Sequence, residues 1–347
     1  VGDVKQSIYR WRNGDWGILN SLGSSQSQPQ LYNNSSQLSF PFPVRVETLK
    51  VNRRSETNVI NFNNRLFTAA VDYLNSLHLE ELKEAIRDDT VLVSIMFVNN
   101  EMGAVEDIKK ISEIIKSKNK NMLFHVDAIQ AYGKYKIVPK KMGIDLMSVS
   151  GHKIHGPKGS GFLYIKENTK IRPIIFGGGQ QKGMRSGTEN VPAIAGLGLA
   201  AKLIYGGHSE KTEKLYELKK MLIDGLYKIG DDNKCADGSC GVVINGIDGI
   251  DIKETAPHVV SASFYGIKSE VLLHALAAKG VYVSSGSACS SNHPELSGTL
   301  KAIGVSDELL DSTIRFSFSV ETTKEQVEYA LEVLKKQLPI LKRFIKQ

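Results

Sequence analysis

Polar side chains capable of binding or catalysis follow three separate strands that the sequence predicts. In chain order they are Asn99, Asn100, Asp127, Gln130, Ser150, His152 and Lys153. Because ligands of open α/β sheets collect beyond the carboxyl ends of the strands, we expect these side chains to form one site. Taken singly, each residue type has a commoner role: a solvated lysine, a helix-capping aspartate, or a histidine that only makes hydrogen bonds.

A run of small residues surrounds Cys289. Residues 284–291 read Ser-Ser-Gly-Ser-Ala-Cys-Ser-Ser and lie between a predicted strand and a proline-containing loop. Structural cysteines are buried in apolar surroundings, so this thiol is predicted to be accessible and nucleophilic. Four residues lie between Cys235 and Cys240, but no second ligand pair exists, which favours two free thiols over a metal site.

A glycine-rich stretch and one arginine could also bind anions. The glycines at 177–179 and the polar residues at 183–188 form a basic sequence that could hold an anion, although an ordinary surface loop is the commoner explanation. Arg315, on a predicted strand, could bind a carboxylate with two parallel hydrogen bonds or form a structural ion pair. No G-x-G-x-x-G follows a strand and no P-loop is present, which excludes the common nucleotide-binding motifs.

The elements that must position these residues alternate along the chain from about Leu79. Strand-length apolar runs occupy 91–98, 122–126, 146–149 and 161–165, and isoleucines at 108, 111, 114 and 115 share one helix face. This alternation predicts an α/β fold with a mostly parallel sheet. From about Lys211, predicted helices at 212–229, 269–279 and 324–338 accompany strands at 241–244, 259–264, 281–284 and 313–318, which indicates a smaller α+β domain.

Composition limits the class of protein. The 347 residues are 41% hydrophobic and 23% charged, values typical of a folded globular chain with two domains. No apolar stretch approaches the roughly 18 residues of a membrane span, and three cysteines are too few for a disulfide framework, so we expect a reducing, cytoplasmic setting. The net charge of +7 suits anionic ligands, but no block is basic enough to indicate nucleic acid.

The first part of the chain differs from the rest. Between Asp15 and Arg45 there is no charged residue, and 21–40 hold 7 Ser, 4 Gln and 2 Asn. Such a composition cannot bury enough apolar area to offset chain entropy, so about 20–43 are predicted to be a loop or disordered linker. Because the chain starts at Val1 without an initiator Met or a signal peptide, we expect a processed, truncated or joined end.

Five ordered segments are familiar as a set: Val98–Gly103, His125–Gln130, Ser150–Gly159, Arg185–Thr188 and Ser284–Ser291. The set closely resembles the cysteine desulfurases, pyridoxal 5'-phosphate (PLP)-dependent enzymes of the class V aminotransferase family, from about Leu79 to the C-terminus. The resemblance implies PLP-dependent transferase fold type I, with an N-terminally incomplete large PLP-binding domain at 79–210. A small α+β domain at 211–347 would carry the Cys289 loop.

The resemblance assigns cofactor contacts to the matching residues. Lys153 would hold PLP as a Schiff base, Asp127 would pair with the pyridinium nitrogen, and Gln130 would hydrogen-bond the ring hydroxyl. Ser150 and His152 would bind the phosphate. Thr188 would reach the phosphate bound by the neighbouring subunit of a homodimer.

Substrate contacts also follow from the resemblance. Asn100 would contact both the cofactor and the bound amino acid, and Arg315 would bind the carboxylate of L-cysteine. Cys289 would attack the substrate sulfur, which leaves a persulfide and releases L-alanine. The catalytic candidates are therefore Lys153, His152 and Cys289.

The N-terminal motifs of the family are not found in this sequence. Members have an Asp-Asn-Ala-Ala-Thr-like start, a Gly-Thr-Glu-type phosphate-binding turn and a Glu-His pair whose His stacks on the PLP ring. Instead, within residues 1–77, Val1–Arg12 and Leu49–Ser55 resemble two motifs of superfamily 1 (UvrD-like) DNA helicases. The helicase P-loop and acidic motif are absent, so ATP hydrolysis is not expected.

The sequence thus predicts a chimera of two partial sequences. The first hypothesis is a cysteine desulfurase that serves iron–sulfur cluster or thio-cofactor assembly through a scaffold or acceptor protein, with turnover weakened by the missing motifs. The alternative is an inactive chimera or a helicase-derived nucleic-acid-binding fragment. Within the PLP class, a lyase acting on selenocysteine or another amino acid is a third possibility, although the Cys289 loop favours cysteine.

Overall fold

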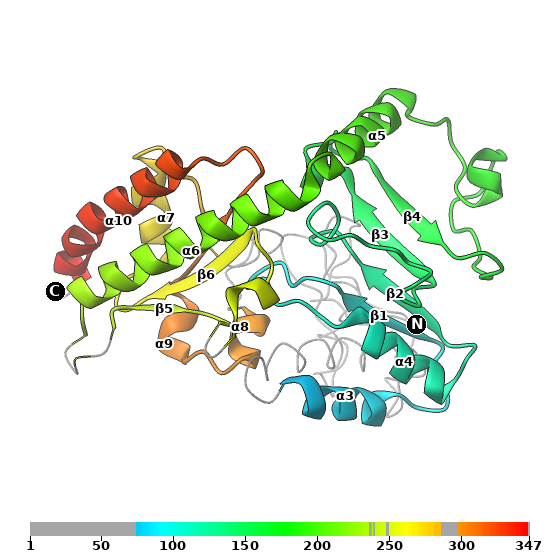
Figure 1. The fold of residues 1–347 in the computed structure, drawn as a ribbon, viewed down its shortest axis with the longest axis horizontal. Coiled ribbons are helices and arrows are strands. Elements are labelled where there is room, and N and C mark those ends of the chain that lie inside the picture. Colours follow the sequence, from blue (N-terminus) through cyan, green and yellow to red (C-terminus); the bar gives the residue numbers. More distant parts are fainter. Residues whose placement is uncertain (1–73, 236–237, 239, 248–249, 286–296, 346–347) are drawn as a thin grey trace, which may run out of the picture. The chain divides into compact units, whose positions relative to one another are not determined.

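The fold is known from a computed structural model that describes residues 74–345, except 236–237, 239, 248–249 and 286–296 (Figure 1). The predicted linker at 20–43, nearly all of the helicase-like segment and Cys289 therefore lie outside the described residues. The described strands form two four-stranded sheets.

The first sheet has the strand order β1-β2-β3-β4. Its strands are β1 Leu92–Met96, β2 Leu123–Asp127, β3 Leu146–Ser150 and β4 Gly161–Ile165. The first three are parallel, which confirms the prediction of a mostly parallel sheet. β4 runs antiparallel to β3. Only ten residues separate these two strands, fewer than a parallel crossover requires.

Helix α4, Ile108–Lys118, covers part of this sheet. The four predicted isoleucines, at 108, 111, 114 and 115, are all buried, and the Asp107 carboxylate caps the helix by accepting a bond from the Lys110 backbone N–H. Helix α3, Leu74–Ala85, packs beside α4. Ile95, Phe124 and Val126 are fully buried in the core between helix and sheet.

The second sheet is antiparallel, with the order β5-β6-β8-β7. Its strands are β5 Val242–Ile244, β6 Val259–Phe264, β7 Ser284–Ser285 and β8 Thr313–Ser317, and the helices that pack with them are α6 His208–Asp232, α7 Ser269–Ala277 and α10 Lys324–Ile345. Two short helices, α8 Gly298–Ala302 and α9 Asp307–Leu310, precede β8. Every residue of β6 is buried.

The bounds of several elements differ from the sequence prediction, most of all those of α6, β7 and α10. Helix α6 is longer than predicted at both ends, and β7 is shorter because only Ser284 and Ser285 pair with β8. Helix α10 continues through Pro339, where we expected it to end. A proline removes one helical hydrogen bond, and neighbouring turns can carry the helix past it. Helix α7 ends at Ala277, two residues before the predicted end, and Gly280 with its φ of +77° follows in the turn after it.

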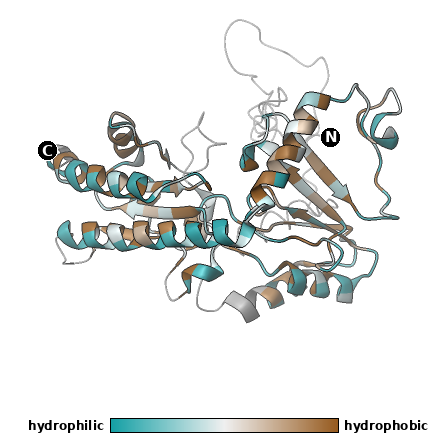
Figure 2. Ribbon diagram, turned by 45° about the horizontal axis from the view of Figure 1, so that its top comes forward, coloured by the Kyte–Doolittle hydropathy of each residue, from teal (hydrophilic) through white to brown (hydrophobic). Residues whose placement is uncertain are grey.

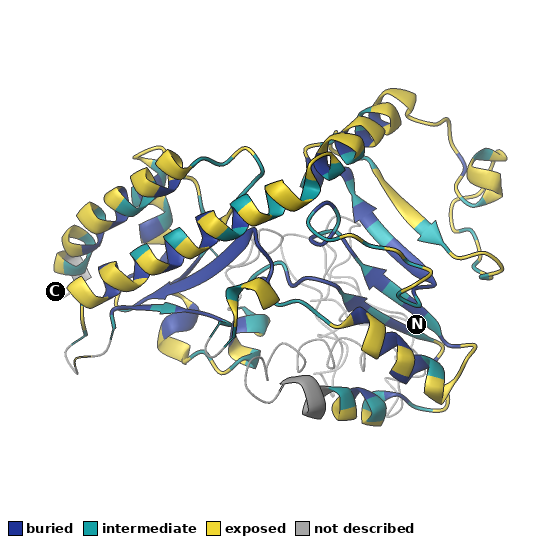
Figure 3. Ribbon diagram, viewed as in Figure 1, coloured by how far each residue is buried: buried dark blue, intermediate teal, exposed yellow. Residues whose placement is uncertain are grey.

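Helix α5, Val191–Tyr205, differs from the other long helices because its surface is mainly hydrophobic (Figure 2). Figure 3 shows that much of α5 and of β4 is exposed, whereas β1 to β3 are largely buried. Large exposed apolar side chains there and in the intervening loop include Leu163, Ile174, Phe176, Val191, Leu199 and Leu203. No helix in the described part of the chain is both long and apolar enough to cross a membrane.

One lysine is buried in the second half of the fold. Lys219, on α6, is 1% exposed. Its Nζ donates to the Thr255 hydroxyl at 2.6 Å and to the Ala256 carbonyl at 2.8 Å. Burial lowers the pKa of Lys219 to about 7.

We expect this lysine to make the free energy of unfolding rise with pH between about 7 and about 10.4, the pKa of an unfolded lysine. In that range the unfolded chain holds a proton that the folded chain has lost, so the slope is positive, at most about 1.4 kcal/mol per pH unit. Lys219→Met should flatten the slope of the free energy of unfolding against pH. Urea denaturation at pH 7.5 and pH 9.5, both within that range, measures this slope. Lys134, whose pKa burial lowers to about 8, should leave a residual slope.

Lys220→Met is the matched control, because the neighbouring Lys220 is exposed and pairs with Asp224. It should leave the slope unchanged. An equal slope in wild type and Lys219→Met would contradict the expectation.

Candidate active site

Lys153 lies in the short 3-10 helix η3, Gly151–Ile154, directly after β3. The helix ends at His155, which has a left-handed φ of 64° and donates its backbone N–H to the Gly151 carbonyl. Gly151 fits because a Cβ there would lie 2.6 Å from the Ser160 hydroxyl. This tight turn places Lys153 at the carboxyl end of a sheet strand, where the sequence predicted a site.

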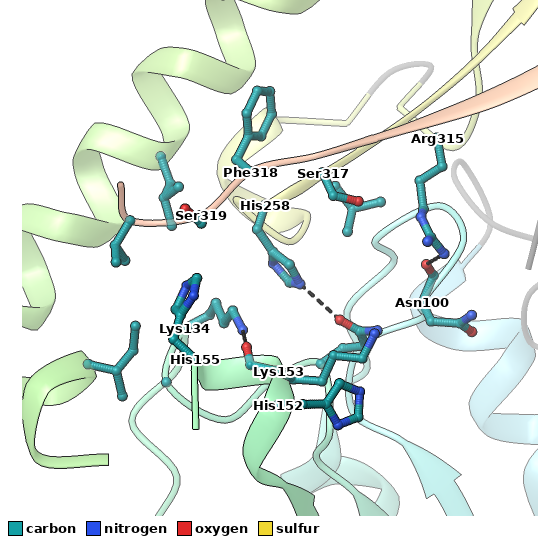
Figure 4. A pocket seen from close by; sticks show the side chains of 16 residues that line it. Asn100, Lys134, His152, Lys153, His155, His258, Arg315, Ser317, Phe318 and Ser319 are labelled. Atoms are coloured by element: carbon teal, nitrogen blue, oxygen red, sulfur yellow. Dashed lines mark hydrogen bonds between the residues drawn. The ribbon is translucent and has the colours of Figure 1, made fainter. Parts of the chain in front are cut away.

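A cavity brings together residues from both sheets (Figure 4). Five of the predicted site residues line it: Asn100, Gln130, His152, Lys153 and Arg315. Lys134, His155, His258 and residues 317–320 also line it and were not predicted. Among the described lining residues there are three lysine or arginine cations and no carboxylate. The cavity is therefore suited to an anionic ligand.

Arg315 connects the two sheets at this cavity. It lies on β8, and its Nη1 donates to the Asn100 carbonyl at 2.9 Å, while Nη2 donates to the Ser284 hydroxyl at 3.3 Å. Asn99 shapes the loop on the other side, because its buried side-chain oxygen accepts bonds from two backbone N–H groups of the following turn. Asn100 and Arg315, predicted as substrate contacts, therefore lie in direct contact.

Lys134 supports the turn that carries Lys153. Its Nζ donates to the Lys153 carbonyl at 2.9 Å. Burial, and then the charge of Lys153, lower the pKa of Lys134 to about 8. Its spacing in the sequence is a signal for this position, because Lys134 follows the predicted site segment His125–Gln130 by only four residues.

Asp127 and Ser150 lie next to the cavity residues in sequence but are not among its lining residues. The Asp127 carboxylate accepts the Ile129 N–H at 2.9 Å. Burial raises the pKa of Asp127, and this bond and the nearby His125 oppose the rise. The Ser150 hydroxyl is 2.7 Å from His152 Nδ1, so these two predicted phosphate ligands are paired with each other.

Thr188 and Cys289 are the remaining predicted site residues. Thr188 is exposed and does not line this cavity, and Cys289 lies outside the described residues. The roles that the sequence assigned to these two residues stay predictions.

The sequence profile of the aminotransferase class-V family matches residues 61–330. This chain belongs to the aminotransferase class-V family. A curated relative, the cysteine desulfurase IscS of Clostridium botulinum (strain Hall), is 42% identical over 266 residues, which are 77% of this chain and 64% of that protein. The chain thus spans somewhat less than two thirds of the length of this relative.

Solved structures show the same family fold. A NifS-like protein matches with a TM-score of 0.66 and 36% identity over 76% of this chain and 65% of its own. The NifS-like protein of Rickettsia africae matches with a TM-score of 0.65 and 32% identity over 77% of this chain and 68% of its own. The predicted fold, that of a PLP-dependent transferase, is confirmed.

The family match begins at residue 61, so it does not reach the two segments that resemble helicase motifs. That resemblance stays a prediction. The matches support the class V interpretation of the remaining chain, and they give no support to the alternative of a helicase-derived nucleic-acid-binding fragment.

Proposed function

We propose that this chain is a cysteine desulfurase that converts L-cysteine to L-alanine and leaves a persulfide on Cys289. The observation that carries the proposal is the cationic cavity at which Asn100, Gln130, Lys153 and Arg315 meet. Residues 79–210 would form the PLP-binding domain, and 211–347 the small domain with the Cys289 loop.

Proteins of this family use PLP, and the side chains at the cavity fit it. The phosphate and a substrate carboxylate are anions, and the lining supplies lysine, arginine and histidine. Asp127 is a partly buried carboxylate with a raised pKa, so a pyridinium nitrogen would give it the opposite charge that favours its ionised form. Lys153 would hold the cofactor, Gln130 its ring hydroxyl, and Ser150 and His152 its phosphate.

When bound, PLP would withdraw electrons from the α-carbon of the amino acid. Arg315 would bind the substrate carboxylate and thereby orient the α-hydrogen toward Lys153. The Nζ of Lys153 would accept that proton and later return one as L-alanine forms. The Cys289 thiolate would attack the substrate sulfur, so that an S–S bond forms while the C–S bond breaks and its electron pair stays on carbon.

The proposal includes a homodimer in the cytoplasm. The exposed apolar side chains of β4, the following loop and α5 support a second copy as the partner, because large exposed apolar patches mark interaction sites. Thr188 would contribute to the neighbouring subunit's phosphate site. The persulfide would pass to an iron–sulfur scaffold or another sulfur acceptor.

The test is the visible spectrum of the purified chain with added PLP, followed by assays for products after L-cysteine and a reductant are added. We expect a band of protein-bound PLP that changes on addition of L-cysteine, and alanine and sulfide in equal amounts. D-cysteine should give neither product. Alanine from L-selenocysteine but not from L-cysteine would favour the lyase, and the absence of any bound cofactor would refute the proposal. Salt-dependent DNA binding would support the helicase-derived alternative.

A further inference from the structure

His258 is the most buried titratable side chain among the described residues that line the cavity. It is 5% exposed and directly precedes β6. The chain around it makes two backbone hydrogen bonds: the Ala256 N–H, two residues earlier, donates to the Gly103 carbonyl at 2.7 Å, and the His258 carbonyl accepts the Phe318 N–H at 2.9 Å. The backbone that carries the ring is therefore held in place.

The ring reaches across to a residue of the first sheet. His258 Nε2 lies 3.2 Å from the side-chain oxygen of Gln130, which is itself only 9% exposed (Figure 4). Gln130 is 128 residues away in sequence and follows β2. A hydrogen bond between two buried side chains fixes the orientation of both, because leaving either one unsatisfied is costly.

The charge state of His258 decides which atom donates. Burial lowers the pKa of His258 well below its ordinary value, and Lys134, Lys219, Lys153 and Arg315 lower it further by their charge. The neutral ring has one N–H, which Nε2 uses as the donor to the Gln130 oxygen. With that oxygen occupied, the Gln130 NH2 group is left to donate to a ligand in the cavity.

A merely structural histidine would be expected to have both nitrogens bonded, since buried polar atoms are nearly always satisfied. Nδ1 of His258 is buried and has no hydrogen-bond partner among the described residues. This second nitrogen at a cationic cavity indicates a side chain that serves the site as well as the packing of the sheet.

We propose that His258 is a positioning residue that holds the Gln130 side chain with its NH2 group directed at the cofactor hydroxyl. The inference rests on the proposed function and adds to it a residue outside the five sequence segments. His258 acts through Gln130 and does not itself touch the reacting atoms.

The experiment measures the Kd for PLP by equilibrium dialysis in wild type, His258→Phe, Gln130→Ala and the double variant. Removing one neutral hydrogen bond from the site should weaken PLP binding about three- to tenfold in each single variant. Because both act through one contact, the double variant should bind PLP no more weakly than Gln130→Ala. His258→Gln keeps an N–H donor near the position of Nε2. Its increase in the Kd for PLP over wild type, on a logarithmic scale, should be at most half the increase seen in His258→Phe.

The outcomes separate this inference from the proposed function. Wild-type protein that binds no PLP would overturn both. Wild type that binds PLP, with His258→Phe binding equally well, would overturn the inference alone. Fully additive losses in the double variant would also overturn it, since His258 would then act independently of Gln130. If His258→Phe does not fold, His258→Leu, which also lacks an N–H donor, takes its place alone and on the Gln130→Ala background and is judged by the same criteria.

Discussion

Lys153→Ala is expected to abolish both retention of PLP and turnover of L-cysteine. Lys153 is the lysine that the tight turn after β3 places in the cavity, held there by the bond from Lys134 to its carbonyl. Under the proposed function, the cofactor would lose its covalent attachment and the α-proton its acceptor, and loss of such a group lowers the rate on the order of 10³-fold or more. Dialysis followed by the visible spectrum and an alanine assay measures both effects.

Lys158→Ala is the matched control, because Lys158 is five residues further along the same loop and exposed. It should keep the cofactor band and the activity of wild type. The free energy of unfolding of Lys153→Ala, measured by urea denaturation, should equal that of wild type to within about 0.5 kcal/mol. The reason is that the Lys153 side chain is only partly buried and lies outside the core. A Lys153→Ala protein that retains PLP through dialysis would show that another residue holds the cofactor.

Local patterns predicted the elements well where the hydrophobic period was strong. The four isoleucines of α4 and the fully buried strand β6 needed only neighbouring residues to be recognised. The antiparallel direction of β4 depends on the short connection from β3, and the length of β7 depends on how far it pairs with β8. Strand pairing is a long-range property, so a local pattern does not determine it.

The site was predicted in part for the same reason. The rule that polar residues gather at strand ends predicted that Asn100, Gln130 and Lys153 would lie together, and all three line the cavity. His258 was missed because it precedes a strand of the other sheet and meets Gln130 only after folding. The predicted ligand of Thr188 is a phosphate in a second copy of the chain, so the role of Thr188 stays a prediction.

The described residues on either side of Cys289 in the sequence, Ser284 and Ser297, contact Arg315 and the neighbour of Asn100. Ser284, in β7, bonds Arg315, and Ser297 donates to the Glu101 carboxylate at 2.5 Å, next to Asn100. The described residues that flank the Cys289 segment in sequence are therefore bonded beside the cavity, and the proposed function assigns the nucleophilic thiol to Cys289.

Cys289→Ala should accordingly retain PLP but form neither alanine nor sulfide at a measurable rate, a loss on the order of 10³-fold or more for removal of a nucleophile. Cys235→Ala is the control, because Cys235 is a free thiol before β5 and does not line the cavity. The two variants separate binding from sulfur transfer: Lys153→Ala loses the cofactor band, whereas Cys289→Ala keeps it. Sulfide release by Cys289→Ala at the wild-type rate would mean that sulfur leaves without a protein persulfide, which is the chemistry of a lyase and not of a desulfurase.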